Sequence, residues 1–157
     1  MTKNYYLAYG SNLNVAQMEH RCPSARVAGW AVLNGYRLVY QGSGTGAYLS
    51  IEKHKGGHVP VGVWEIDAAC ERALDCYEGW PEFYAKGLAK VELFSENGDF
   101  LRKVVGLIYW LPEVHAYGVP SKFYLETCAQ GYEDFGFDQD VLDQALDDTL
   151  EELYGEK

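Results

Sequence analysis

The N-terminal part of this chain contains the stretch Tyr5-Tyr6-Leu7-Ala8-Tyr9-Gly10-Ser11-Asn12-Leu13, which has the pattern of a strand followed by a turn. Its first five residues are aromatic or aliphatic and predict a β-strand. Gly10 can leave a strand without the steric cost of a Cβ atom, and Ser11 and Asn12 are good N-cap residues for a following helix. We expect a turn here whose backbone N–H groups converge on one point. Such a cluster binds a carboxylate or an oxyanion, although the same turn can be purely structural.

A short helix and then a run of strands follow this junction, with one helix inserted among the strands and two helices at the end. Apolar alternation and glycine or proline punctuation predict the strands, and periodicity and capping residues predict the helices. The expected strands cover residues 26–40 (one bent strand or two), 47–52, 59–66, 84–94 and 102–110. The expected helices cover residues 14–21, 68–76, 122–130 and 139–153. We predict a flexible loop at residues 42–46 and a turn at Lys55-Gly56-Gly57-His58.

This order of elements is that of an α+β fold rather than of alternating βαβ units. Consecutive strands with glycine kinks suggest a small, strongly curved sheet or a closed barrel. The 157 residues fit a single domain, which we expect to span residues 1–157.

The charge balance and the lack of long apolar runs limit the classes of partner. The chain carries 13 basic and 23 acidic residues, a net charge of −10, which opposes binding to nucleic acid or to anionic lipid. The longest apolar run, residues 104–111, is too short to cross a bilayer. No signal peptide precedes the first strand. We therefore expect a cytoplasmic protein with no nucleic-acid or membrane partner.

A second cluster, Tyr77-Glu78-Gly79-Trp80-Pro81-Glu82-Phe83-Tyr84, places a carboxylate among aromatic residues at the end of the expected helix. The negative pole of the helix and desolvation by the aromatic side chains both raise the pKa of Glu78. A glutamate with a raised pKa suits a general base or acid near neutral pH. The alternative is an exposed glutamate beside a glycine that caps the helix.

Other motifs indicate no cofactor or metal. Residues 42–46 are rich in glycine but lack the lysine of a phosphate-binding loop. His54 and His58 are separated by a Gly-Gly pair rather than held on one helix face. No cysteine pair has the spacing of a zinc site. We therefore expect neither a metal nor a cofactor.

Taken together, the two clusters resemble the γ-glutamylcyclotransferase-like family, which includes the AIG2-like proteins. The resemblance rests on Tyr9-Gly10-Ser11-Asn12-Leu13 and on Glu78-Gly79-Trp80-Pro81-x-Phe83-Tyr84. Residues 61–66 and the stretch Pro120-Ser121-x-x-Tyr124 support it, and it extends to about Gly136. One departure is Trp80, where the family often has tyrosine, and this difference could reshape the wall of the site.

The resemblance implies a small antiparallel β-barrel with flanking helices and an intramolecular reaction. The α-amine of a γ-glutamyl compound attacks its own γ-carbonyl, and 5-oxoproline and an amine or amino acid are released. Neither water nor a cofactor is consumed. Glu78 is the expected catalytic acid and base. The substrate-binding residues expected from the resemblance are Tyr6, Leu7, Ala8, Tyr9, Gly10, Ser11, Asn12, Leu13, Tyr84 and Tyr124.

Two other functions stay open at this point. A non-catalytic module that binds γ-glutamyl metabolites could use the same fold, because fold alone does not determine activity. An amidohydrolase that uses water would release glutamate instead of 5-oxoproline. The partner expected in either case is a small γ-glutamyl molecule, and we expect the protein to be a monomer or a homodimer.

Overall fold

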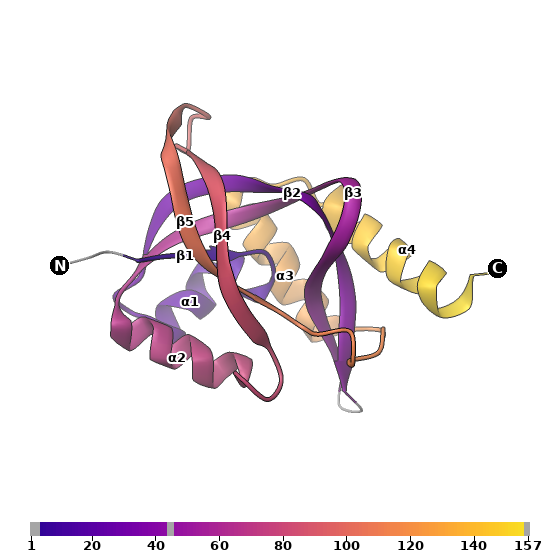
Figure 1. Cartoon of the computed structure of the whole chain (residues 1–157). Coiled ribbons are helices and arrows are strands. Elements are labelled where there is room, and N and C mark those ends of the chain that lie inside the picture. The colour runs from indigo at the N-terminus through magenta and orange to yellow at the C-terminus, as the bar shows by residue number, and fades with distance from the viewer. Residues whose placement is uncertain (1–3, 44–45, 156–157) are drawn as a thin grey trace.

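Five strands form a closed barrel in the computed structural model of the chain, which describes residues 4–43 and 46–155 (Figure 1). Around the barrel the strands are ordered β1-β3-β2-β4-β5. Their bounds are β1 Asn4–Ala8, β2 Arg26–Ser43, β3 Gly46–Ile66, β4 Ala85–Phe94 and β5 Phe100–Trp110. The expected barrel with flanking helices is confirmed.

Within the described residues, four α-helices and one 3₁₀ turn accompany the barrel (Figure 1). Their bounds are η1 Ser11–Leu13, α1 Val15–Arg21, α2 Ala68–Glu78, α3 Lys122–Phe135 and α4 Asp140–Tyr154. Each α-helix begins near its expected start. Helix α3 continues five residues beyond its expected end and stops at Gly136, which adopts the left-handed conformation that favours glycine.

The barrel departs from a purely antiparallel arrangement in one pairing. Strand β1 runs parallel to β5, with Tyr5 opposite Gly106 and Tyr6 opposite Leu107, whereas the other neighbouring strands are antiparallel. Around a closed ring of five strands, neighbouring strands cannot all run in opposite directions, because five is an odd number. A closed barrel with five strands therefore needs at least one parallel pair. The parallel pairing therefore follows from closing the barrel with an odd number of strands.

Strand β3 is longer than the sequence indicates, because two expected strands and the turn between them form one continuous strand. The turn expected at residues 55–58 is wrong: Asn34 pairs with His58 and Tyr36 pairs with Lys53, so residues 54–57 bulge out of the ladder opposite Gly35. A bulge bends a strand without ending it. A flexible loop was expected at residues 42–46. Residues 42–43 belong to β2 and residue 46 belongs to β3, and residues 44–45 lie outside the described residues.

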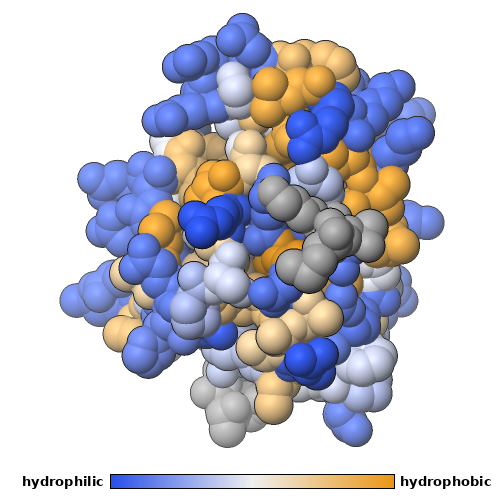
Figure 2. Space-filling model, turned by 90° about the vertical axis from the view of Figure 1, so that its left-hand side faces the viewer, coloured by the Kyte–Doolittle hydropathy of each residue, from blue (hydrophilic) through white to orange (hydrophobic). Residues whose placement is uncertain are grey.

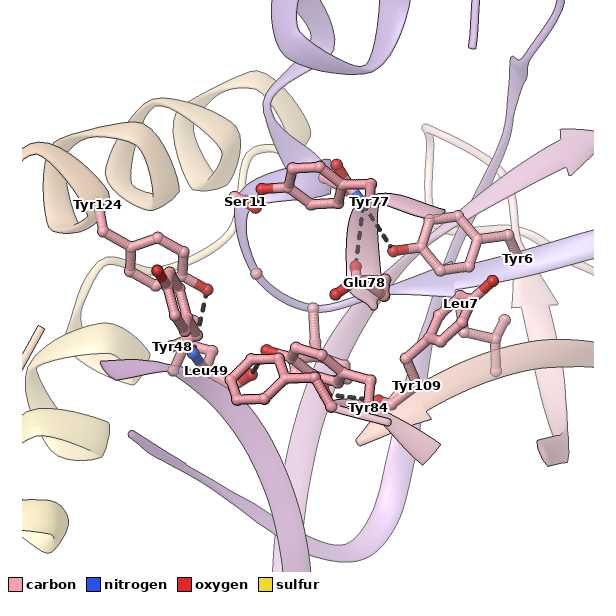
Figure 3. A pocket seen from close by; sticks show the side chains of 14 residues that line it. Tyr6, Leu7, Ser11, Tyr48, Leu49, Tyr77, Glu78, Tyr84, Tyr109 and Tyr124 are labelled. Carbon is pink, nitrogen blue, oxygen red and sulfur yellow. Dashed lines mark hydrogen bonds between the residues drawn. The ribbon is translucent and has the colours of Figure 1, made fainter. Parts of the chain in front are cut away.

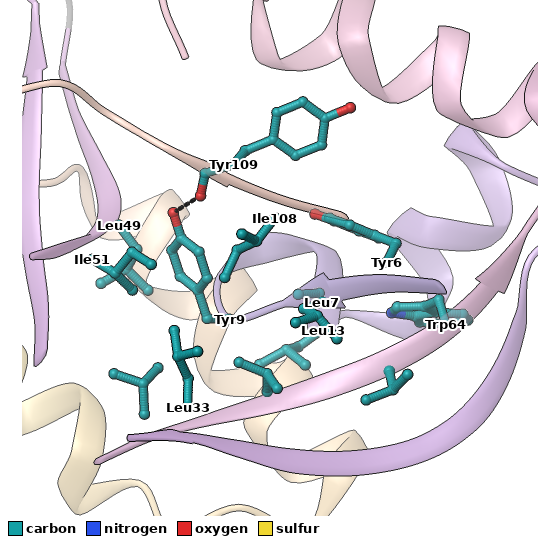
Figure 4. Packing of buried hydrophobic residues seen from close by; sticks show 14 of the residues in the cluster. Tyr6, Leu7, Tyr9, Leu13, Leu33, Leu49, Ile51, Trp64, Ile108 and Tyr109 are labelled. Carbon is teal, nitrogen blue, oxygen red and sulfur yellow. Dashed lines mark hydrogen bonds between the residues drawn. The ribbon is translucent and has the colours of Figure 1, made fainter. Parts of the chain in front are cut away.

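The interior of the barrel is packed with aliphatic and aromatic side chains (Figure 4). Leu7 of β1, Leu13 of η1 and Leu49 of β3 are almost completely buried, and each comes from a segment that borders the expected site. Burying a side chain of this kind contributes about 1.5–3 kcal/mol. The segment that follows β1 is therefore held by the core and not by surface contacts alone.

Helix α4 is attached to the barrel through β2. The Tyr40 backbone N–H donates a hydrogen bond of 2.9 Å to Thr149 Oγ1, and Arg37 forms ion pairs with Glu52 of β3 and Glu152 of α4. Part of the acidic face of this helix therefore contacts an arginine rather than solvent.

The outer face of the β4–β5 hairpin carries exposed hydrophobic residues, among them Leu88, Phe100 and Val105. Figure 2, which views the molecule from the left-hand side of Figure 1, shows hydrophobic patches interrupted by hydrophilic side chains, one of them near the top of the view. The expected choice between monomer and homodimer stays a prediction. None of the helices within residues 4–43 and 46–155 combines the length and the apolar character needed to cross a membrane.

Candidate active site

A cavity of about 270 Å³ lies where the end of β1, the 3₁₀ turn η1, the C-terminus of α2 and helix α3 meet (Figure 3). Figure 3 shows Glu78 near the centre, with Tyr6 on one side and Tyr48 and Tyr124 on the other. The lining consists mostly of aromatic side chains. The lining residues are Tyr6, Leu7, Tyr9, Gly10, Ser11, Asn12, Tyr48, Leu49, Tyr77, Glu78, Phe83, Tyr84, Tyr109 and Tyr124.

The segment after β1 forms the 3₁₀ turn η1 before helix α1 begins. The first hydrogen bond of this turn runs from the Leu13 N–H to the Gly10 carbonyl (3.0 Å), so the Ser11 and Asn12 N–H groups precede it and have no acceptor within the turn. The expectation that Ser11 or Asn12 caps a helix is wrong. Asn14 caps α1 by accepting a hydrogen bond from the Gln17 N–H, at 3.1 Å.

The Asn12 side chain does not cap a helix and instead contacts Tyr6 and Glu78. Its Nδ2 donates to the Tyr6 hydroxyl at 3.0 Å and to Glu78 Oε1 at 3.4 Å. Its Oδ1 accepts a hydrogen bond from Arg21 Nη1. The Asn12 carbonyl accepts from the indole N–H of Trp64 at 3.1 Å. Asn12 is therefore held on both its backbone and its side chain.

Glu78 stands at the C-terminus of α2, as expected from the sequence, and the helix continues two residues beyond its expected end so that Glu78 is its last residue. Asp67 caps the start of this helix by accepting from the Cys70 N–H, and Gly79 ends it in the left-handed conformation, with φ 66°. Burial raises the pKa of Glu78 to about 7, and the positive charge of Arg21 opposes this rise. A carboxyl group with this pKa exchanges protons at neutral pH, which is what acid–base catalysis requires.

Gly10 lies close to two residues that line the cavity, so a side chain here would make tight contacts. A Cβ atom at this position would lie 3.2 Å from the Tyr124 hydroxyl and 3.4 Å from Leu49 Cβ. The φ of Gly10 is −126°, so a left-handed backbone is not the reason for this glycine.

Two tyrosines hold the backbone of β3 at the edge of the cavity. The Leu49 N–H donates to the Tyr124 hydroxyl, and the Tyr84 hydroxyl donates to the Leu49 carbonyl, both at 3.0 Å. Tyr84 lies in the segment after α2 and Tyr124 lies in α3, so Leu49 links these two parts of the chain. Burial raises the pKa of both hydroxyls well above that of a free tyrosine, so both remain protonated at neutral pH.

A further group of contacts connects the cavity to the surface of α2. The Tyr9 hydroxyl donates to the Tyr109 carbonyl at 2.5 Å (Figure 4), and the Tyr109 hydroxyl donates to Asp75 Oδ1 at 2.7 Å. Lys86 pairs with Asp75 at 2.9 Å and lies 3.9 Å from the centre of the Trp80 ring. These contacts orient Tyr9 and Tyr109 in the wall of the cavity.

The structure brings nine of the expected site residues to the cavity and places two elsewhere. Ala8 and Leu13 are buried in the core and do not line the cavity. Tyr48, Leu49 and Tyr109 line it but were not expected. Nothing local in the sequence distinguishes them, because barrel closure brings β3 and β5 to the site. Among the described residues, no three His, Cys, Asp or Glu side chains form a group that could hold a metal ion.

A sequence model of one protein family matches residues 6–126, which include Glu78 and all the described residues that line the cavity. That family is described as "Gamma-glutamyl cyclotransferase, AIG2-like". A comparison with curated proteins found no match.

Solved structures share the fold. One is named "Gamma-glutamyl cyclotransferase", with a TM-score of 0.76 and 22% identity over 92% of this chain and 86% of the other. A human protein described as uncharacterized has the same score and identity, over 92% and 87% of the two chains. YkqA from Bacillus subtilis has a TM-score of 0.71 and 20% identity over 92% of this chain but only 53% of its own.

Proposed function

Because the chain belongs to the gamma-glutamyl cyclotransferase, AIG2-like family, we propose that it is a γ-glutamylcyclotransferase. In this proposal it converts a γ-glutamyl amide into 5-oxoproline and a free amine or amino acid. One observation carries the proposal beyond family membership. Glu78 is the one carboxyl group among the described residues that line the cavity, and its pKa of about 7 suits proton transfer at neutral pH.

The reaction needs one bond made, one bond broken and one proton moved. The substrate α-amine nitrogen bonds to the γ-carbonyl carbon, and the bond from that carbon to the amide nitrogen breaks. Glu78 accepts the proton that the attacking nitrogen loses and delivers it to the departing nitrogen. A single positioned acid and base of this kind contributes about 10²–10⁴ in rate.

The rest of the acceleration comes from holding the substrate in a folded conformation. Nucleophile and electrophile belong to one molecule, and well-oriented intramolecular attack reaches effective concentrations of about 10⁵–10⁸ M. The mostly aromatic cavity supports this role because its walls limit the conformations of a glutamyl chain. We assign the Ser11 and Asn12 N–H groups to the substrate α-carboxylate or to the oxyanion that develops on the γ-carbonyl.

The test is to incubate the protein with a panel of γ-glutamyl amino acids and γ-glutamyl amines and to measure 5-oxoproline and glutamate separately. We expect 5-oxoproline in an amount equal to the released amine. Release of glutamate would instead identify an amidohydrolase. Substrate binding by calorimetry without turnover of any panel member would identify a binding module.

Glu78→Gln, which keeps the shape of the side chain but removes its basicity, tests the role of this residue. We expect turnover to fall by about 10²–10⁴, while calorimetry still detects substrate binding. Glu82→Gln is the matched control, because Glu82 is exposed four residues later and should leave turnover unchanged. Wild-type turnover in Glu78→Gln would refute the assignment.

A further inference from the structure

Arg21 reaches the site without lining the cavity. It is the last residue of α1, and its guanidinium carbon lies 3.5 Å from the centre of the Tyr77 ring. Its Nη1 donates a hydrogen bond to Asn12 Oδ1. Arg21 therefore contacts Asn12 and Tyr77, and both of these residues line the cavity.

The contact with Arg21 fixes which end of the Asn12 amide faces Glu78. A guanidinium group can only donate hydrogen bonds, so it selects the amide oxygen. The amide nitrogen then faces Tyr6 and Glu78, with hydrogen bonds of 3.0 and 3.4 Å. An amide turned the other way would place its oxygen against the carboxylate, where like partial charges repel.

Arg21 is also the charged group that most directly opposes the rise in the Glu78 pKa. Among the described residues, the other titratable side chains that line the cavity with Glu78 are all tyrosines. They are Tyr6, Tyr9, Tyr48, Tyr77, Tyr84, Tyr109 and Tyr124. Asp75, one helical turn earlier on α2, is already paired with Lys86.

We propose that Arg21 is a positioning residue for Glu78: through Asn12 it turns an amide N–H toward the carboxylate, and its charge favours the ionised form that accepts the proton. This role rests on the proposed function, because it matters to catalysis only if Glu78 is the base. Arg21 does not line the cavity, so in this proposal it touches neither the substrate nor the reacting atoms.

Arg21→Gln removes the charge, and Arg21→Lys retains it. An opposite charge within about 4–6 Å lowers a carboxyl pKa by about 1–3, and we take the low end because Arg21 acts across the Asn12 amide. In Arg21→Gln the pKa on the acidic side of the kcat/KM profile should therefore rise by about 1. The ionised fraction at pH 7 then falls from about a half to about a tenth, so kcat/KM falls about fivefold from this cause alone.

A purely structural role would not produce this pattern. Arg21→Lys should return the acidic limb of the pH profile close to its wild-type position and recover most of kcat. Arg72→Gln is the matched control, because Arg72 is an exposed arginine on α2 that does not line the cavity, and its profile should equal that of the wild type. An unchanged acidic limb in Arg21→Gln, or the same shift in Arg21→Gln and Arg21→Lys, would overturn the proposal.

A second measurement separates this proposal from the proposed function. The carboxyl carbon of Glu78, labelled with ¹³C, is titrated by NMR in the wild type, Arg21→Gln and Arg72→Gln, without any substrate. A rise of about 1 in the Glu78 pKa in Arg21→Gln alone supports the role of Arg21, even if no panel compound is turned over. If turnover is found and the Glu78 pKa does not move, the proposed function stands and the role of Arg21 is wrong.

Discussion

Glu78→Gln should make the protein more stable above pH 7, although it removes the proposed catalytic group. The pKa of Glu78 rises from 4.5 to about 7 because the folded protein buries the carboxyl group. The folded state therefore binds the proton more tightly than the unfolded state does. Between these two pH values the folded state holds more protons, so stability falls as the pH rises.

The magnitude follows from the size of this pKa change. Each pH unit between the two pKa values corresponds to about 1.4 kcal/mol, so ionised Glu78 costs the folded state about 3 kcal/mol above pH 7. Glutamine resembles the protonated carboxyl group and avoids this cost. Glu78→Gln should therefore match the wild type below about pH 4.5 and exceed it by up to about 3 kcal/mol at pH 8.

Urea unfolding at several pH values between 4 and 8.5 measures this difference directly. The free energies of unfolding of the two proteins should diverge between about pH 4.5 and 7 and then run parallel. Glu82→Gln should show no such divergence, because Glu82 is exposed. If the wild type and Glu78→Gln differ by the same amount at pH 4.5 and at pH 8, burial does not raise the Glu78 pKa and the reasoning fails.

Three further substitutions test other parts of the site and core. Tyr124→Phe removes the acceptor of the buried Leu49 N–H, so urea unfolding should show a loss of about 1–3 kcal/mol. Gly10→Ala puts a methyl group 3.2 Å from the Tyr124 hydroxyl, so KM should rise while the melting temperature changes little; an unchanged KM would contradict the position assigned to the substrate. Tyr132→Phe removes a buried hydroxyl that has no hydrogen-bond partner among the described residues, so stability should stay the same or increase.

Local signals in the sequence were enough to place Glu78. Asp67 at the start of α2 and Gly79 at its end mark the helix, and both cap it as expected. The position of Glu78 at a helix terminus could therefore be predicted without knowing the tertiary fold. The aromatic residues that follow it are also close in sequence, so the surroundings of the carboxyl group could be expected without knowing the barrel.

Asn12 shows where a local signal was ambiguous. Ser11, Asn12 and Asn14 all suit an N-cap, and only Asn14 also has a glutamine three residues later. The structure uses Asn14 for the cap and leaves Asn12 to contact Tyr6 and Glu78. The contact with Glu78 spans 66 residues, so no local pattern could have predicted it.

Tyr48 and Tyr109 needed the complete barrel. Tyr109 reaches the cavity because β5 pairs in parallel with β1, and this pairing depends on the number of strands in the ring. The sequence suggested a turn inside β3, which would have given an additional strand and a different closure. The strand count, and with it the register of distant strands, was therefore the feature that local patterns could not supply.

The directions of the tyrosine hydrogen bonds narrow the choice of proton carrier. The Tyr9 hydroxyl donates its proton to the Tyr109 carbonyl, and the Tyr84 hydroxyl donates to the Leu49 carbonyl. The Tyr109 hydroxyl donates to the Asp75 carboxylate. Burial also raises the pKa of each of these hydroxyls, so none of them ionises at neutral pH. A tyrosine whose proton is already donated cannot also give it to a leaving amine without breaking a buried contact, which costs about 1–3 kcal/mol. These three side chains therefore shape and desolvate the cavity, which is consistent with the proposal that Glu78 carries the proton.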